Sequence, residues 1–141
     1  MTRRISRCEL SGEVSLFTVL VAGDDEYRSE ESMPMLAKLL SHRYGFTCTV
    51  LFPIEPTTGN IVPSFQNNIP GLDHLEKADL MIMLIRFREL PDAQSKYIEN
   101  FLKAGKPVIG LRTSTHGFAY SKNLNSPYAK WAYNSKTVGW E

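Results

Sequence analysis

The segment PVIGLRTSTHGF, residues 107–118, runs from an apolar stretch into a cluster of polar side chains that could perform chemistry. This cluster contains Arg112, Thr113, Ser114, Thr115 and His116. A hydroxyl beside an imidazole suggests a nucleophile and its base, but adjacent residues rarely reach triad geometry, and Arg112 occupies the serine position of G-x-S-x-G. We expect instead that Arg112, Thr113 and Thr115 bind a polar ligand. His116 is the expected proton carrier, because an imidazole titrates near neutrality. The competing interpretation is that the hydroxyls satisfy the backbone of their own loop.

A second polar loop, GDDEYRSEES at 23–32, also follows an apolar run. Asp24 and Glu26 could accept hydrogen bonds from hydroxyl groups or act as acid and base, and Arg28 could clamp an anion. The alternative is that acidic residues ahead of a helix complement the helix dipole and keep an exposed loop soluble. The sequence leaves both interpretations open.

A third loop, RFRELPD at 86–92, supplies two arginines. If the chain stays extended, Arg86 and Arg88 lie on the same side of the pleat. They could pair structurally with the acidic loop, or they could face an anionic or hydroxyl-rich ligand.

Apolar runs that are typical of buried parallel strands precede all three loops. These runs are residues 16–22, 79–85 and 107–111, with a fourth at 46–52. Amphipathic stretches at 33–44 and 92–104 predict helices between the strands. The alternation predicts an α/β fold, a three-layer sandwich with a parallel sheet of flavodoxin-like order. In such open sheets functional groups lie beyond the carboxyl ends of the strands, near the switch in strand order, and this rule selects the same three loops.

Composition excludes several classes of function. The 141 residues carry 16 Lys and Arg against 15 Asp and Glu, so a net charge of +1 gives no reason to expect binding to nucleic acid or to an anionic membrane. No apolar run approaches a membrane span, and residues 1–15 lack a signal-peptide core, so we expect a cytoplasmic protein. The histidines and cysteines show no zinc-ligand spacing, and we expect neither a metal nor a cofactor.

Three segments together resemble the trehalose-utilisation (ThuA-like) family of the class I glutamine amidotransferase-like superfamily. They are VLVAGDDEYRSEESMPMLAKLL, ADLMIMLIRFRELPDAQSKYIENFLKAGKPVIGLRTSTHGF and SPYAKWAYNSKTVGW. The resemblance runs from about residue 17 to the end. It implies a flavodoxin-like sandwich that binds or processes a sugar or another small polar compound in carbohydrate utilisation. Amidotransferase relatives place a cysteine after the strand that PVIGL matches, whereas this chain has Arg112 or Thr113 there, which implies that it has no thiol nucleophile.

The resemblance also leads to expectations about the ends of the chain. Residues 1–15 do not match the family and are expected to form an irregular N-terminal extension. Residues 16–141 form the ThuA-like domain, which we expect to lack its C-terminal part because family members are usually longer. The alternative functions are a non-catalytic interaction module, with the aromatic-rich segment 119–141 as its interface, and an inactive fragment of a larger protein. Self-association into a homo-oligomer would cover an apolar face left open.

Overall fold

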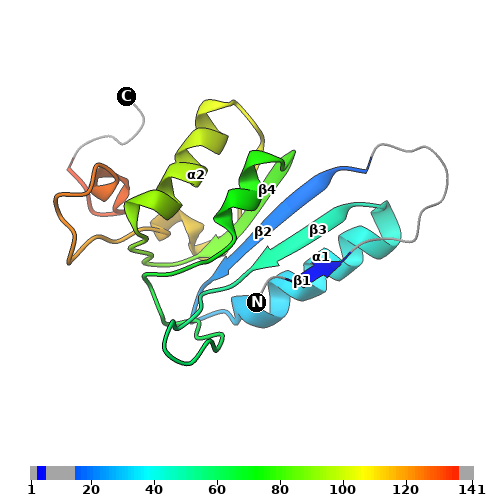
Figure 1. The fold of residues 1–141 in the computed structure, drawn as a ribbon, viewed down its shortest axis with the longest axis horizontal. Coiled ribbons are helices and arrows are strands. Elements are labelled where there is room, and N and C mark those ends of the chain that lie inside the picture. The colour runs from blue at the N-terminus through cyan, green and yellow to red at the C-terminus, as the bar shows by residue number, and fades with distance from the viewer. Residues whose placement is uncertain (1–2, 6–14, 137–141) are drawn as a thin grey trace.

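A five-stranded sheet in the order β1-β3-β2-β4-β5 forms the centre of the molecule (Figure 1). The computed structural model describes residues 3–5 and 15–136. The four parallel strands are β2 (Phe17–Gly23), β3 (Thr47–Leu51), β4 (Leu80–Ile85) and β5 (Val108–Gly110). Their order, β3-β2-β4-β5, is that of the first four strands of a flavodoxin-like sheet, so the predicted α/β class is confirmed.

One expectation for residues 1–15 is wrong in part. Arg3–Ile5 are not irregular but form strand β1, which pairs antiparallel with β3 and sets Ile5 opposite Cys48. The physical reason is that β3 would otherwise present an unpaired row of backbone groups at the edge of the sheet. Residues 1–2 and 6–14 lie outside the described part of the chain.

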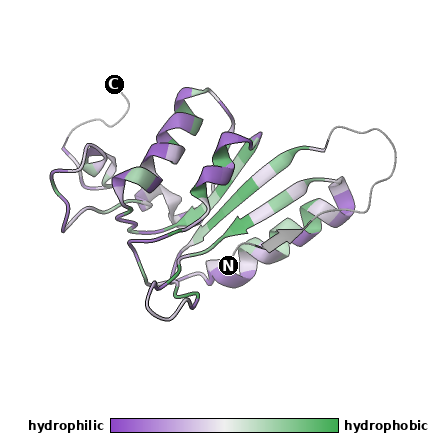
Figure 2. Cartoon of the chain, viewed as in Figure 1, coloured by the Kyte–Doolittle hydropathy of each residue, from purple (hydrophilic) through white to green (hydrophobic). Residues whose placement is uncertain are grey.

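Helices cover the two faces of the sheet and complete the three layers. On one face lies α1 (Ser29–Tyr44); on the other lie α2 (Asp92–Lys103) and the short 3-10 helix η1 (Leu72–Glu76). Alternate residues of β2 separate into the two cores: Val19 and Val21 pack on the α2 side, Leu20 and Ala22 on the α1 side. Burial on both faces explains why β4 is an unbroken apolar run and β2 is interrupted only by Thr18 before Gly23 (Figure 2).

Helix α1 begins earlier than the apolar pattern at 33–44 predicts. Its first residue is Ser29, whose hydroxyl accepts hydrogen bonds from the N–H groups of Gly23 and Asp24 and donates to the Asp24 carbonyl. These bonds close the loop after β2 within a few residues, so the helix starts almost at once. It ends at Gly45, which adopts a φ of 74°, as expected for the glycine that follows a helix.

The C-terminal aromatic residues pack mainly on their own domain. Tyr120 and Tyr128 are buried beside Ala132, and the Phe118 ring lies 5.4 Å from Trp131, centroid to centroid. Tyr133 is 56% exposed. Of the aromatic residues expected to form an interface, the structure therefore buries two tyrosines and leaves Tyr133 open. Within the described ranges, no helix is long and apolar enough to span a bilayer.

Candidate functional site

Three loops meet beyond the carboxyl ends of β2, β4 and β5, where the strand order reverses. Backbone bonds join them. The Arg86 N–H donates to the Gly23 carbonyl over 2.9 Å, and the Arg88 N–H donates to the Gly117 carbonyl over 2.7 Å. These are the loops that the sequence selects, and the fold brings them together as one edge of the sheet.

Each of these loops contains one non-glycine residue in the left-handed region. Arg28 follows β2 with a φ of 52°, Phe87 follows β4 with a φ of 53°, and Arg112 follows β5 with a φ of 40°. No other non-glycine residue of the described ranges has a positive φ. Such conformations cost about 1–3 kcal/mol each and gather at functional sites. Their restriction to this edge is independent support for a site here.

Asp24 lies at the bottom of the site and is fully buried. Its Oδ1 accepts hydrogen bonds from the N–H groups of Glu26 over 2.7 Å and Tyr27 over 2.8 Å, and its Oδ2 accepts from the Thr113 hydroxyl. Burial by itself raises the pKa of Asp24. The hydrogen bonds, together with the charge of Arg86, outweigh burial and lower the pKa below the ordinary 3.8. Asp24 therefore holds the loop after β2 to the loop after β5 as an ionised carboxylate.

Two hydroxyl groups of the short 3-10 helix η2 (Arg112–His116) form hydrogen bonds with other parts of the fold. Thr113 is buried and donates to Asp24. Ser114 donates to the Met83 carbonyl over 2.9 Å and accepts from the Ile85 N–H over 3.3 Å. Neither hydroxyl is placed as a free nucleophile, and their bonds go to neighbouring elements instead of to the backbone of their own loop.

Arg88 does not lie beside Arg86 at the surface, as the extended chain predicts, but is buried. It is 1% exposed, and its guanidinium donates to the carbonyls of Arg86, Pro63 and Phe65 over 2.7–3.1 Å. Burial lowers the pKa of Arg88 to about 10, with Asp25 and Asp24 opposing the shift. These contacts give Arg88 a structural role, because they tie residues 63–65, in the long connection between β3 and β4, to the end of β4.

The open surface of the site is a network of charged and aromatic side chains. Arg86 Nη1 lies 3.2 Å from Glu26 Oε2 and 3.4 Å from Asp25 Oδ1. Arg112 donates over 2.9 Å to the Tyr27 hydroxyl, with its guanidinium carbon 4.6 Å from the centroid of the Tyr27 ring. The pKa of Arg112 is raised, first by the Tyr27 hydrogen bond and also by the charge of Glu26. Glu26 thus pairs with Arg86, and its neighbour Tyr27 holds Arg112 from the loop after β5.

His116 and Thr115 continue this surface toward the C-terminal segment. The His116 ring lies 5.4 Å from Phe87 and 6.3 Å from Tyr133, centroid to centroid, and its Nδ1 is 3.3 Å from the Thr115 hydroxyl oxygen. Arg28 instead pairs with Glu31 on the first turn of α1. Five of the sequence-predicted residues reach the surface of the site: Glu26, Arg86, Arg112, Thr115 and His116. Three others are buried beneath it: Asp24, Thr113 and Arg88. Arg28 pairs with its own helix instead of facing the site.

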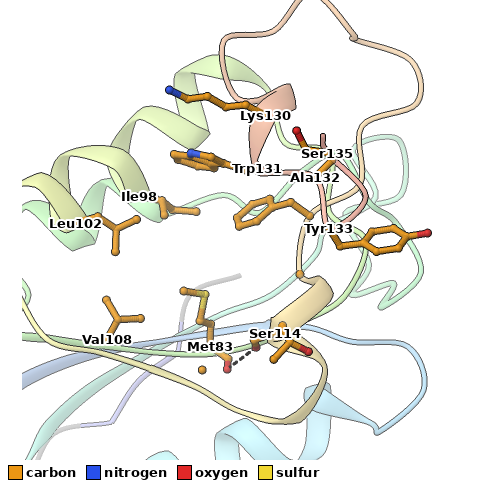
Figure 3. A pocket seen from close by; sticks show the side chains of 14 residues that line it. Met83, Ile98, Leu102, Val108, Ser114, Lys130, Trp131, Ala132, Tyr133 and Ser135 are labelled. Carbon is orange, nitrogen blue, oxygen red and sulfur yellow. Dashed lines mark hydrogen bonds between the residues drawn. The ribbon is translucent and has the colours of Figure 1, made fainter. Parts of the chain in front are cut away.

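A separate pocket of about 510 Å³ opens on the α2 side of β4 and β5 (Figure 3). Its apolar side chains include Met83, Ile98, Leu102, Val108 and Trp131. Among the residues predicted as ligands, only Thr115 lines it. The sequence shows these apolar side chains, but nothing in their pattern indicates that they would be left partly uncovered.

The described residues form no metal site, and the comparisons with known proteins found no match. In the described part of the chain, no three His, Cys, Asp or Glu side chains gather as metal ligands. Comparison of the sequence with protein-family models and with curated proteins, and of the chain with solved structures, gave no significant match.

Proposed function

We propose that this chain binds a small hydroxyl-rich compound, such as a sugar or a sugar phosphate, across the loops after β2, β4 and β5, as a ThuA-like domain in carbohydrate utilisation. The proposal rests chiefly on one observation. Side chains from three loops are joined at this edge of the sheet, where Glu26 pairs with Arg86 and Tyr27 accepts a hydrogen bond from Arg112, and open α/β sheets bind their ligands at such an edge.

The chemistry of these groups suits such a ligand. Arginine forks donate to hydroxyl or phosphoryl oxygens, and a carboxylate accepts from sugar hydroxyls. Arg86 and Arg112 provide the donors, and Glu26 provides an acceptor beside Arg86. His116 and Thr115 add an imidazole and a hydroxyl at the side of the site. Asp24 and Thr113 position the loops from below without contacting the ligand.

The proposal includes no thiol chemistry. Cys48 is buried within β3, far along the chain from the three loops, and burial raises the pKa of its thiol despite a hydrogen bond with Ser41. A raised pKa disfavours the thiolate that a nucleophilic mechanism needs. Cys8 lies outside the described residues.

Nuclear magnetic resonance titration tests the proposal. The ¹⁵N-labelled chain is titrated in parallel with glucose, trehalose and glucose 6-phosphate. We expect concentration-dependent shifts confined to residues 24–28, 86–88 and 112–116 with at least one probe. Arg112→Gln should weaken that binding by about tenfold to a hundredfold, because a lost charge-assisted hydrogen bond is worth about 1.5–3 kcal/mol.

Arg43→Gln is the matched control, because Arg43 is an exposed arginine in the last turn of α1, at the other end of that helix. This variant should respond like the parent chain. The proposal would be refuted if none of the three probes shifts these residues. It would also be refuted if Arg112→Gln and Arg43→Gln bind as tightly as the parent.

A further inference from the structure

A second pocket, of about 450 Å³, opens at the amino end of the sheet, on the side that η1 covers. Its volume lies within the usual range of small-molecule sites. Strands β2 and β3 border it, since Phe17 and Thr47 are the first residues of these strands and are partners in the register. The residues that line it are Ser15, Phe17, Thr47, Thr49, His74 and Lys77. The pocket therefore lies at the opposite end of the strands from the three loops described above.

The sequence of β3 explains why a pocket forms here. One face of the strand carries Cys48 and Val50, which pack in the core beneath α1. The other face carries Thr47 and Thr49 before its first apolar side chain, Leu51. A parallel strand that is covered on both faces is normally apolar on both. The amino half of this face is polar instead, and it borders a pocket and not a core.

Thr49 is the polar group that this pocket leaves unsatisfied. It is 1% exposed, and its hydroxyl has no hydrogen-bond partner in the part of the chain that the structure describes. Burial of a hydroxyl without a partner costs free energy of folding. The other two hydroxyls differ, because Ser15 donates to the Gly45 carbonyl over 2.7 Å and the Thr47 oxygen lies 2.9 Å from that of Ser15. A ligand in the pocket supplies the partner that Thr49 lacks.

The basic side chains of the lining favour an anionic ligand. Lys77 is exposed, and its ammonium group forms no ion pair or hydrogen bond with a described residue. His74 Nδ1 lies 2.9 Å from the Gly71 carbonyl oxygen, so the ring donates there and its Nε2 is left for a ligand. Among the described residues that line the pocket, none is acidic.

The acidic residues that are close in sequence lie outside this lining. They are Asp73, Glu76 and Asp79. Asp79 Oδ2 accepts a hydrogen bond from the Phe17 N–H over 2.9 Å. Asp73 Oδ1 lies 3.7 Å from His74 Nδ1, the ring nitrogen that faces Gly71. The charge that the lining itself presents is therefore that of Lys77.

We propose that this pocket binds the oxyanion group of a small molecule, a carboxylate or a phosphoryl group. Lys77 supplies the opposite charge, and the Thr49 hydroxyl donates to an oxygen of the anion. Phe17 forms an apolar wall, and the volume leaves room for a carbon skeleton beyond the anionic group. The proposal does not depend on the ligand proposed for the three loops, which lie at the other end of the sheet.

Chemical shifts of the ¹⁵N-labelled chain measure this binding. The chain is titrated at constant pH with sodium phosphate and with sodium acetate, and sodium chloride at equal ionic strength controls for general salt effects. We expect saturating shifts at residues 15–17, 47–49 and 74–77 with at least one of the two oxyanions and none with chloride. The oxyanion that binds more tightly identifies the group. Shifts with neither oxyanion, or the same shifts with chloride, would overturn the proposal.

Two lysine variants test the source of the charge. Lys77→Gln should weaken the binding by about tenfold or more, because it removes a charge-assisted contact. Lys38→Gln is the matched control, because Lys38 is an exposed lysine on α1, across the sheet from η1, and this variant should bind like the parent. Equal binding by Lys77→Gln and the parent would refute the assignment of the pocket.

Two threonine variants separate binding from folding. Thr49→Val should weaken the binding by about fivefold, the effect of one neutral hydrogen bond. It should leave the urea midpoint of the free chain unchanged or higher, because the hydroxyl that it removes has no partner in the fold. Thr18→Val is the matched control: the Thr18 hydroxyl is also buried without a described partner, but it lies on the α1 side of β2 and should not affect binding. A lower midpoint for Thr49→Val, or equal binding by Thr49→Val and Thr18→Val, would contradict the proposal.

Discussion

Replacing Thr113 by valine removes one hydrogen bond from the buried carboxylate of Asp24 while keeping the shape of the side chain. Thr113 is 4% exposed and Asp24 is fully buried, so no water can replace the lost donor without opening the loops. A hydrogen bond to a charged group contributes about 1.5–3 kcal/mol to stability. We therefore expect Thr113→Val to lower the free energy of unfolding by that amount at pH 7, and the urea midpoint by about 1 M.

The pH dependence identifies the carboxylate as the partner. The pKa of Asp24 in the folded chain lies below 3.8, so this stabilisation is complete above pH 3.8 and is lost as the pH falls through the lower folded value. Thr113→Val removes one of the hydrogen bonds that lower the pKa of Asp24. The difference in unfolding free energy between parent and variant should therefore be full near neutrality and should shrink in acid.

Urea unfolding followed by circular dichroism, at pH 7 and at pH 3, measures both effects. Thr113→Ser keeps a hydroxyl and should recover most of the loss. In an Asp24→Ala background, Thr113→Val should cost little further stability, because its partner is already absent. The reasoning is refuted if Thr113→Val lies within about 0.5 kcal/mol of the parent at pH 7, the size of an ordinary surface substitution. It is also refuted if the loss is the same with and without Asp24.

Two further predictions concern the buried groups after β4. Arg88→Met keeps the length of the side chain but leaves the carbonyls of Pro63 and Phe65 without donors, so we expect a loss of about 3–5 kcal/mol in urea unfolding; a loss below about 1 kcal/mol would contradict the structural role of Arg88. Glu89 is 4% exposed and accepts hydrogen bonds from the N–H groups at 121–123. Burial raises the pKa of Glu89, but these bonds outweigh burial and lower it below 4.5. Glu89→Gln should cost about 1.5–3 kcal/mol above pH 4.5 and progressively less below it, with faster amide exchange at 121–123; unchanged exchange there would contradict the prediction.

The fold follows from sequence patterns far more directly than the site does. The apolar runs before Gly23, Arg86 and Arg112 predict the strands, and the rule for open sheets then selects three loops that the fold brings together at one edge of the sheet. The same patterns do not distinguish Asp24 from Glu26. Both are acidic residues of one polar loop, but Asp24 is buried and accepts backbone hydrogen bonds, whereas Glu26 faces solvent. Burial of a carboxylate depends on donors from distant loops, such as Thr113, which only the fold brings near.

The two arginines after β4 show how one backbone angle overturns a correct rule. In an extended chain Arg86 and Arg88 share a side of the pleat. Phe87 between them adopts a φ of 53°, which breaks the alternation. Arg86 consequently stays with the acidic loop, while Arg88 enters the interior and binds backbone carbonyls. Because Phe87 is neither glycine nor asparagine, its sequence gives no warning of a left-handed conformation.

Strand β5 illustrates a different limit of sequence reasoning. The run PVIGL predicts a strand buried on both faces, and the chain does form a strand there, but Ile109 remains 46% exposed and Val108 borders an open pocket. Apolar patterning states which side chains gain free energy from burial, and it does not state which molecule buries them. Within the described residues Val108 packs against the core on the α2 side, whereas Ile109 and Gly110 are exposed, so the cover of this strand is set by the fold around it and not by its own apolar pattern.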